Sequence, residues 1–224
     1  MDEDIDYPSS DGKRMAEDTL QADWIMKLHG NLGWLFHKEP NVFVAADLLW
    51  YPVEGEPGIR HAPDAMVALG RPKGHRGAYL QWKEGAVAPQ VVFEVLSHCI
   101  EPAEFQRIED FYRHYGVEEF YWYDPWRKKL GGRLRRGDDL EPIPNLDGWV
   151  SPLLGVRFEM SGDLTIYHPN GELFLSFVER DQLRRRYAEQ AERYRQQADL
   201  AVAEINRLRA LLHEKGIDPA PPAE

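Results

Sequence analysis

The chain has very little cysteine: Cys99 is the only one among 224 residues. An intramolecular disulfide is therefore impossible, which is typical of proteins from reducing compartments. Long hydrophobic runs are also absent, and without about 18 consecutive apolar residues no helix spans a membrane. The acidic start MDEDIDYPSSDGK has no apolar segment of the kind that a signal peptide needs. We expect a cytoplasmic protein with no membrane partner.

Positive charge is scarce as well. The chain has 27 Lys and Arg against 38 Asp and Glu, a formal net charge of −11. Because phosphates attract basic surface, this balance argues against a protein that coats nucleic acid. A local basic groove stays open, built from RPKGHR (71–76) or from RKK (127–129) with RLRR (133–136). The alternative is that these are solvated loop and hairpin charges.

No P-loop and no glycine-rich dinucleotide motif occurs, so we expect no nucleotide cofactor. The periodic segments that are present predict an α+β fold built on a mixed sheet. Two helices are expected at 17–36 and 102–115, and a short one near 78–82. Strands are expected at 42–51, 64–69, 90–97 and 118–125, followed by β-segments from 127 to 178 with a hairpin turn at Asn170-Gly171.

The C-terminal region shows a different pattern, in which apolar residues alternate at spacings of four and three. These residues are Tyr187, Ala191, Tyr194, Ala198, Ala201, Ile205, Leu208 and Leu212. Such a heptad repeat predicts a coiled coil. A single exposed helix would leave this stripe in water, so we expect self-association through it; the alternative is packing onto its own domain. The predicted organisation is a flexible N-terminus (1–16), a globular domain (17–178), a coiled-coil helix (179–215) and a disordered tail (216–224).

Two acids stand out because they lie on predicted strands. Glu94 interrupts the apolar strand QVVFEVLS, and Asp64 follows Pro63 at a strand start. A buried carboxylate is costly unless it has a partner, a proton or a metal. Two carboxylates and water suffice for Mg²⁺ or Mn²⁺, which can activate water and stabilise charge on a phosphodiester. The alternatives are a turn role for Asp64 and an ion pair with arginine for Glu94.

Further acids lie in the same part of the chain: Asp47 in an earlier predicted strand and Glu17 near the start of the first helix. His61, just before the Pro-Asp pair, could touch a phosphate or a metal, but an ordinary loop histidine is the simpler interpretation.

The order helix, strand, PDAMV, spacer, PQVVFEVLS, helix, YGVEEFYWYDP resembles the Uma-two (DUF820-like) family of restriction endonucleases in the PD-(D/E)XK nuclease superfamily. The resemblance covers roughly residues 5–178, and the tail LRALLHEKGIDP is similar to the coiled-coil extension of cyanobacterial members. It implies a restriction-endonuclease-like mixed β-sheet core flanked by helices. It also implies that Asp64 and Glu94 are metal-binding catalytic acids, with Mg²⁺ or Mn²⁺ as cofactor and DNA as the molecule acted on.

The lysine that the resemblance implies is missing. In the superfamily motif it stands two residues after the glutamate, where this chain has Leu96. In the Uma-two family it stands four residues before the tyrosine of Y...GV, which corresponds to Tyr112. That position is Ile108, so the motif is broken at its catalytic base.

Three cationic residues are candidates to replace this lysine: the neighbouring Arg107, and Lys83 or Lys73 from elsewhere in the chain. Arginine is a poor proton-transfer group because it stays charged. We therefore expect a Mg²⁺-dependent DNA endonuclease that is weakened or inactive. The alternative is a non-catalytic module on the nuclease fold that binds nucleic acid or a protein and self-associates through its coiled coil.

Overall fold

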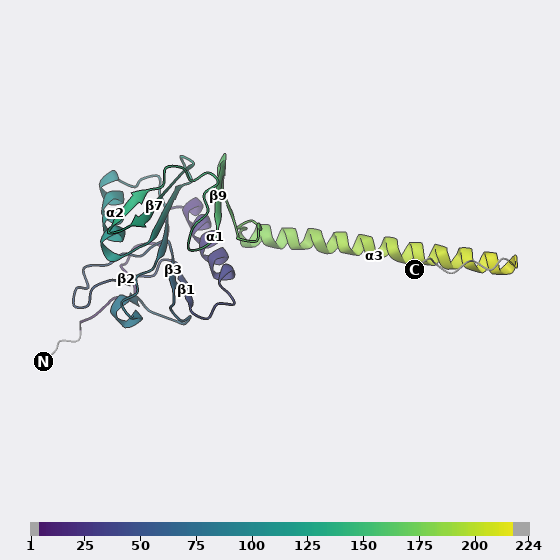
Figure 1. The fold of residues 1–224 in the computed structure, drawn as a ribbon, viewed down its shortest axis with the longest axis horizontal. Coiled ribbons are helices and arrows are strands. Elements are labelled where there is room, and N and C mark those ends of the chain that lie inside the picture. The colour runs from purple at the N-terminus through teal and green to yellow at the C-terminus, as the bar shows by residue number, and fades with distance from the viewer. Residues whose placement is uncertain (1–4, 217–224) are drawn as a thin grey trace. The chain divides into compact units, whose positions relative to one another are not determined.

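The computed structural model describes residues 5–216. The chain divides into two compact units, between Ser176 and Phe177 (Figure 1). Within the described residues no helix combines the length and the apolar character needed to cross a membrane. Most of the segment predicted to be a disordered tail, from residue 217 on, lies outside the described residues.

The first unit is built on a six-stranded sheet with the order β1-β3-β5-β6-β7-β8. The strands are β1 (Val42–Ala45), β3 (Ala65–Leu69), β5 (Val91–Val95), β6 (Glu119–Asp124), β7 (Lys129–Arg136) and β8 (Asp139–Pro142). The pair β5 and β6 is parallel and every other pair in this sheet is antiparallel. The predicted α+β class with a mixed sheet is confirmed.

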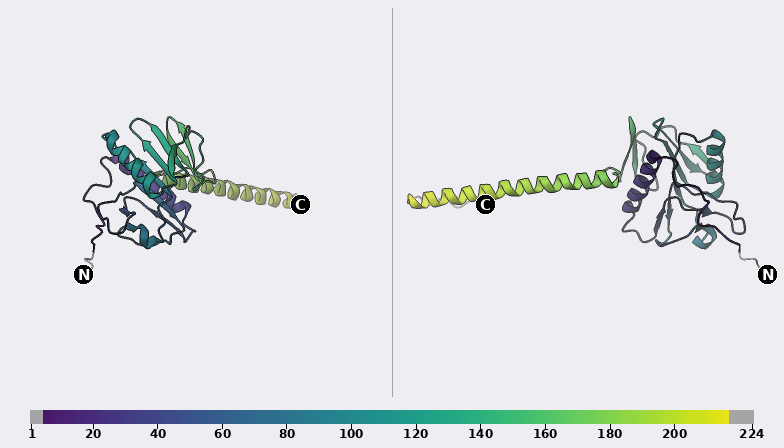
Figure 2. Two further views of the ribbon diagram at one scale, coloured as in Figure 1. Left: turned by 60° about the vertical axis from the view of Figure 1, so that its left-hand side comes forward. Right: turned by 180° about the vertical axis from the view of Figure 1, so that it is seen from behind.

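Helices cover both faces of this sheet (Figure 2). Helix α1 (Thr19–Leu35) packs on one face with the odd-numbered residues of β5, such as Phe93. Helix α2 (Pro102–Tyr115) packs on the other face with the even-numbered residues, such as Val92. Because side chains alternate along a strand, the position of Glu94 assigns it to the α2 face.

Helix α2 is also the connection between the two parallel strands, which cannot be joined by a short hairpin. Pro102 begins the helix, where its missing N–H costs no hydrogen bond. Gly116 ends it with a φ of +95°, a left-handed conformation that glycine adopts without strain. The prediction of a helix over 102–115 ended by Gly116 is confirmed.

The strand predicted at 42–51 is wrong as a single element. Asp47 has a left-handed φ of +48° and interrupts it. After the break, β2 (Trp50–Tyr51) pairs in parallel with β4 (Tyr79–Leu80) in a separate small sheet. A 3₁₀ turn, η1 (Gln81–Glu84), follows β4, close to the short helix predicted there.

The turn predicted at Asn170-Gly171 is present: Gly171 donates to the carbonyl oxygen of His168 at 2.9 Å and Phe174 donates to that of Ile166 at 2.8 Å. Beyond the turn the chain pairs through a bridge between Tyr167 and Leu173 and forms no regular strand. The regular partner of β10 (Asp163–Tyr167) is instead β9 (Arg157–Ser161), to which it is joined through Gly162. The second unit is one helix, α3 (Phe177–Glu214), and none of its described residues is buried.

Close contact between β6 and β7 leads to a stability prediction. Glu94, Trp122 and Gly131 are cross-strand neighbours in one row. A Cβ added at Gly131 would overlap the indole of Trp122. Gly131→Ala should therefore destabilise the unit by about 1–3 kcal/mol, the usual cost of overpacking. Urea denaturation followed by circular dichroism measures this.

The matched control is Gly30→Ala in α1, because a Cβ there meets no atom within 4 Å. It should stabilise the helix by roughly 0.5–1 kcal/mol. Equal effects of the two substitutions would contradict the overlap at Gly131.

Candidate functional site

The strand register brings the two predicted acids together. Strands β3 and β5 pair with Ala65 opposite Phe93. One further step along both antiparallel strands places Asp64 opposite Glu94. Directly opposed residues in an antiparallel pair have Cβ atoms about 4.5–5.5 Å apart and point to the same face. The predicted convergence of the two acids, which are 30 residues apart in sequence, follows from this pairing.

Asp64 lies in a desolvated position, with only 9% of its surface exposed. Its Oδ2 accepts a hydrogen bond from the backbone N–H of Val95 at 2.6 Å. Burial raises the pKa of the Asp64 carboxyl well above its usual range, and the charge of Glu94 and a hydrogen bond between the two side chains raise it further. Ionising Asp64 beside Glu94 is therefore costly, and a proton on Asp64 or a cation beside it would remove that cost.

Glu94 is held from the other side by helix α2 and by the segment before Asp64. Its Oε1 accepts a short hydrogen bond from the hydroxyl of Tyr112 and lies 3.0 Å from Nε2 of His61. Tyr112 is fully buried, and this burial, followed by the charge of Glu94, raises its pKa well above its usual range. The phenol therefore keeps its proton and stays a donor. Within residues 5–216 these contacts replace the ion pair with arginine that was the alternative interpretation.

The contact of His61 was missed by the sequence analysis, which favoured an ordinary loop histidine. The backbone of His61 forms a bridge with Trp50, and this bridge fixes the irregular segment beside the sheet. Its ring packs against those of Phe111 and Tyr112. The only signal in the sequence was its position three residues before Asp64.

The start of α1 approaches the same end of β5. The side-chain amide of Gln21 donates to the carbonyl oxygen of Val95 at 2.8 Å, and its oxygen accepts from the backbone N–H of Glu17 at 2.9 Å. Asp18 caps the helix by accepting from the N–H of Gln21. The N–H and the carbonyl group of Val95 are thus both bonded to other elements, and Glu17 is brought close to the end of the Glu94 strand.

Asp47 follows β1, which lies on the side of β3 away from β5 and Glu94. The β1–β3 register ends with Ala45 opposite Met66, and Asp47 follows two residues later, beyond the last pair. Asp47 donates its N–H to the carbonyl oxygen of Pro63 at 3.0 Å. Its pKa is raised by partial burial and then by Asp11, and its charge contributes to the raised pKa of Asp64. Glu94 and Asp47 therefore both place negative charge near Asp64.

Ile108 lies one turn before Tyr112 on the same helix and packs with Phe105 and Trp122 in the apolar cluster on this face of the sheet. The predicted orientation of this face of α2, toward the strand that carries Glu94, is confirmed. Arg107 is exposed, and within the described part of the chain no contact joins it to either acid. Its catalytic role stays a prediction.

The two lysines considered as substitutes lie in separate elements. Lys73 donates to the carbonyl oxygens of Phe36 and His37, at the C-terminal end of α1. Lys83 is exposed on η1.

The two basic segments are largely paired inside the unit. In the first, Arg76 bonds the carboxylate of Glu84 at 2.6 Å. In the second, Arg133 bonds the buried carboxylate of Glu109 at 2.7 Å. Further pairs are Arg71 with the carbonyl of Glu84, Arg127 with Asp124, Lys128 with Asp163, and Arg135 with the carbonyl of Val117. These contacts favour the interpretation of loop and hairpin charges.

A mixed sheet with a helix on each face, and two acids that meet on neighbouring strands, is the arrangement implied by the restriction-endonuclease-like class. A family model named Uma2, described as "Putative restriction endonuclease", matches residues 16–167. The chain therefore belongs to this family. It is also similar to a solved structure from Anabaena variabilis described as "a putative nuclease belonging to DUF820". That similarity has 12% identity and a TM-score of 0.44, and it covers 60% of this chain and 72% of the other. No curated protein matches the chain.

The raised pKa of Asp64 predicts a pH-dependent stability difference. An acid with a raised folded-state pKa contributes its full stability below its unfolded pKa of about 3.9. That contribution is lost as pH rises through the folded pKa. In EDTA, Asp64→Asn should therefore raise the melting temperature at pH 7 and lose this advantage near pH 4. The amide oxygen can still accept from Val95 N–H.

Calorimetry at the two pH values measures the effect. Asp6→Asn, at an exposed position of the N-terminal segment, is the control and should change little. A lower melting temperature of Asp64→Asn at pH 7 would contradict the desolvated acid pair.

The Tyr112 hydroxyl gives a second prediction. Tyr112→Phe keeps the ring packing but removes one donor from Glu94, and hydrogen bonds to charged groups contribute about 1.5–3 kcal/mol. The unfolding free energy should fall by about that amount in chemical denaturation. Tyr115→Phe, on the same helix, should be nearly neutral, so equal losses would argue against a specific bond to Glu94.

Proposed function

We propose that the globular unit holds Mg²⁺ or Mn²⁺ with Asp64 and Glu94 and hydrolyses phosphodiester bonds of DNA, at a rate limited by the absence of a lysine at position 108. The observation that carries this proposal is the opposed pair of acids, in which burial and then the charge of Glu94 raise the pKa of Asp64. Such a pair is destabilised when both members ionise, and a divalent cation removes that repulsion.

The donor set fits a hard cation, which prefers carboxylate oxygens and keeps several waters. Within residues 5–216 no three His, Cys, Asp or Glu side chains form a ready-made metal-binding group. Asp64 and Glu94 would therefore be completed by water or by backbone oxygen. The ion would supply an activated water and stabilise charge on the phosphodiester.

The other residues of the site orient these two acids. Tyr112 and His61 both contact Oε1 of Glu94, which fixes the rotation of its carboxylate. The N–H of Val95 fixes the carboxyl group of Asp64 in the same way. Neighbouring groups that orient ligands in this manner commonly affect metal affinity by 10-fold to 100-fold.

We attribute the slow DNA cleavage in this proposal to Ile108. This side chain packs in the apolar cluster beside Tyr112 and offers no group that could take or give a proton. General acid–base help from a positioned side chain typically contributes about 10²–10⁴-fold to a rate.

A non-catalytic module that binds nucleic acid or protein is the second candidate function. It is favoured by the same Ile108 and by a net charge of −11.

Placing a lysine at position 108 distinguishes the two candidate functions. Nicking of supercoiled plasmid by the full chain with Mg²⁺ should be slow, and Ile108→Lys should raise the rate by about 10²-fold or more. Ile108→Gln is the matched control, because it is polar and of similar length but has no basic group. Adding Asp64→Asn to Ile108→Lys should abolish the gain, since cleavage then lacks its metal ligand.

Thermal unfolding checks that each variant is folded. If Ile108→Lys folds and binds Mn²⁺ by calorimetry but cleaves no DNA, the second candidate function is the better one. Fast wild-type cleavage that depends on Asp64 and Glu94 would show that another residue supplies the base. Arg107→Ala and Lys83→Ala would then locate it.

A further inference from the structure

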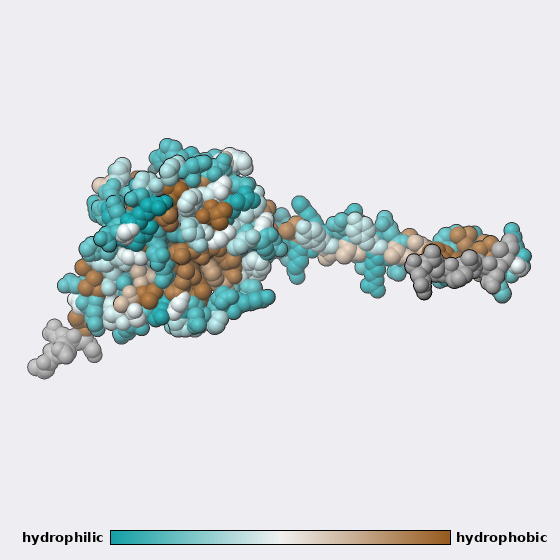
Figure 3. All heavy atoms as spheres, in the orientation of Figure 1, coloured by the Kyte–Doolittle hydropathy of each residue, from teal (hydrophilic) through white to brown (hydrophobic). Residues whose placement is uncertain are grey.

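Helix α3 exposes an apolar stripe along most of its length. The eight residues that repeat at spacings of four and three, from Tyr187 to Leu212, are here called the seam. Tyr194 is 62% exposed, Ile205 47% and Leu208 50%, and no residue of α3 is buried. Figure 3 shows hydrophobic residues uncovered along this helix. An exposed stripe of this length favours a partner surface.

The spacing assigns a heptad position to each seam residue. Ala191, Ala198, Ile205 and Leu212 take the a positions, and Tyr187, Tyr194, Ala201 and Leu208 take the d positions. A β-branched residue at a with leucine at d, as in Ile205 and Leu208, favours two parallel strands. The chemistry of the seam therefore matches another copy of itself.

We propose that α3 pairs with α3 of a second copy of this chain in a parallel, in-register, two-stranded coiled coil. This pairing goes beyond the nuclease function proposed above and does not depend on it.

Charged residues beside the seam favour one relative direction of the two α3 helices. The e and g positions flank the seam and set strand direction through ion pairs between helices. Glu204 is at g and Arg209 is at the next e, and in a parallel dimer each such glutamate faces the arginine of the other copy. Two attractive pairs form by symmetry, and no like charges are opposed at these positions. Arg195, also at e, faces the neutral Gln190.

An antiparallel pairing centred on the seam is packed well but lacks these ion pairs. It would set e against e and g against g, so that Glu204 faces Gln197 and Arg209 faces Ala188. No opposite charges then meet, which leaves the parallel arrangement as the one with electrostatic support.

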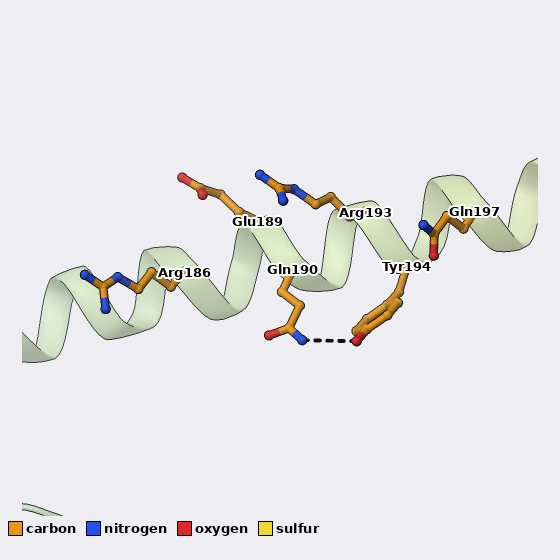
Figure 4. A pocket seen from close by; sticks show the side chains of 6 residues that line it. All are labelled: Arg186, Glu189, Gln190, Arg193, Tyr194 and Gln197. Atoms are coloured by element: carbon orange, nitrogen blue, oxygen red, sulfur yellow. Dashed lines mark hydrogen bonds between the residues drawn. The ribbon is translucent and has the colours of Figure 1, made fainter.

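The two halves of the seam contribute unequally. Ile205, Leu208 and Leu212 fill the C-terminal half with large aliphatic side chains, and their burial supplies most of the hydrophobic gain. In the N-terminal half tyrosine alternates with alanine, so layers of large side chains would alternate with layers of small ones between the two helices. In the single helix Gln190 donates to the hydroxyl of Tyr194 at 3.1 Å, a surface contact along the helix (Figure 4). The C-terminal half should therefore hold the dimer.

The first experiment compares one substitution at two positions of the full chain. Ala201→Lys puts a charge into the seam, whereas Ala203→Lys, two residues on, puts it on the outer face. Sedimentation equilibrium should give the wild type and Ala203→Lys about twice the 26.0 kDa chain mass. Ala201→Lys should shift the protein toward a single chain. A monomeric wild type, or equal masses of the two variants, would overturn the proposal.

The second experiment tests direction. Cys99 is the only cysteine and is exposed, so Cys99→Ser gives a cysteine-free background. In a parallel dimer Leu208→Cys meets its own copy and should form a disulfide-linked dimer on mild oxidation, because paired d positions lie within disulfide reach. Cross-linking that requires Ala191→Cys together with Leu208→Cys would show an antiparallel pair and overturn the parallel assignment.

Discussion

The opposition of Asp64 and Glu94 across β3 and β5 is the constraint around which the globular unit is organised. Strand β5 lies between two other strands and under a helix on each face, so a carboxylate in it has little access to water. The neighbouring elements supply the hydrogen bonds that water would otherwise form with the two carboxyl groups. Helix α2 brings the Tyr112 hydroxyl, the segment before β3 brings His61, and the strand itself offers the N–H of Val95 to Asp64.

The direction of the strands beside Glu94 explains why the connection after β5 is a helix that crosses the sheet. Strands β5 and β6 are parallel, so the chain has to return across the sheet, and α2 does so on the side to which Glu94 points. The helix residues that face the sheet therefore decide both the packing of the core and the chemistry beside the acids. Ile108 serves the first purpose, and a lysine there would serve the second.

The parts of this arrangement that depend on periodicity could be predicted from the sequence. Strong apolar strands and a capped helix indicated the order of elements. Asp64 stands before its strand and Glu94 near the end of its own, so the two acids meet because β3 and β5 are antiparallel, a direction that no pattern in the sequence specified. The break at Asp47 could not be foreseen, because neither glycine nor proline marks it and an aspartate adopts the left-handed conformation instead. The contact of His61 was missed for a related reason: residues 52–63 follow an irregular path that no repeat in the sequence describes.

The backbone of Val95 is bonded to both layers of the unit. Its N–H is bonded to Asp64 on β3's side, and its carbonyl oxygen accepts from Gln21 of α1 on the other face of the sheet. The two bonded groups belong to successive peptide units on either side of the Val95 Cα, so one residue of β5 is bonded both to Asp64 and to α1. A ligand that displaced the Asp64 carboxylate would remove its bond to the Val95 N–H, one residue's backbone away from the carbonyl group that anchors the first turn of α1.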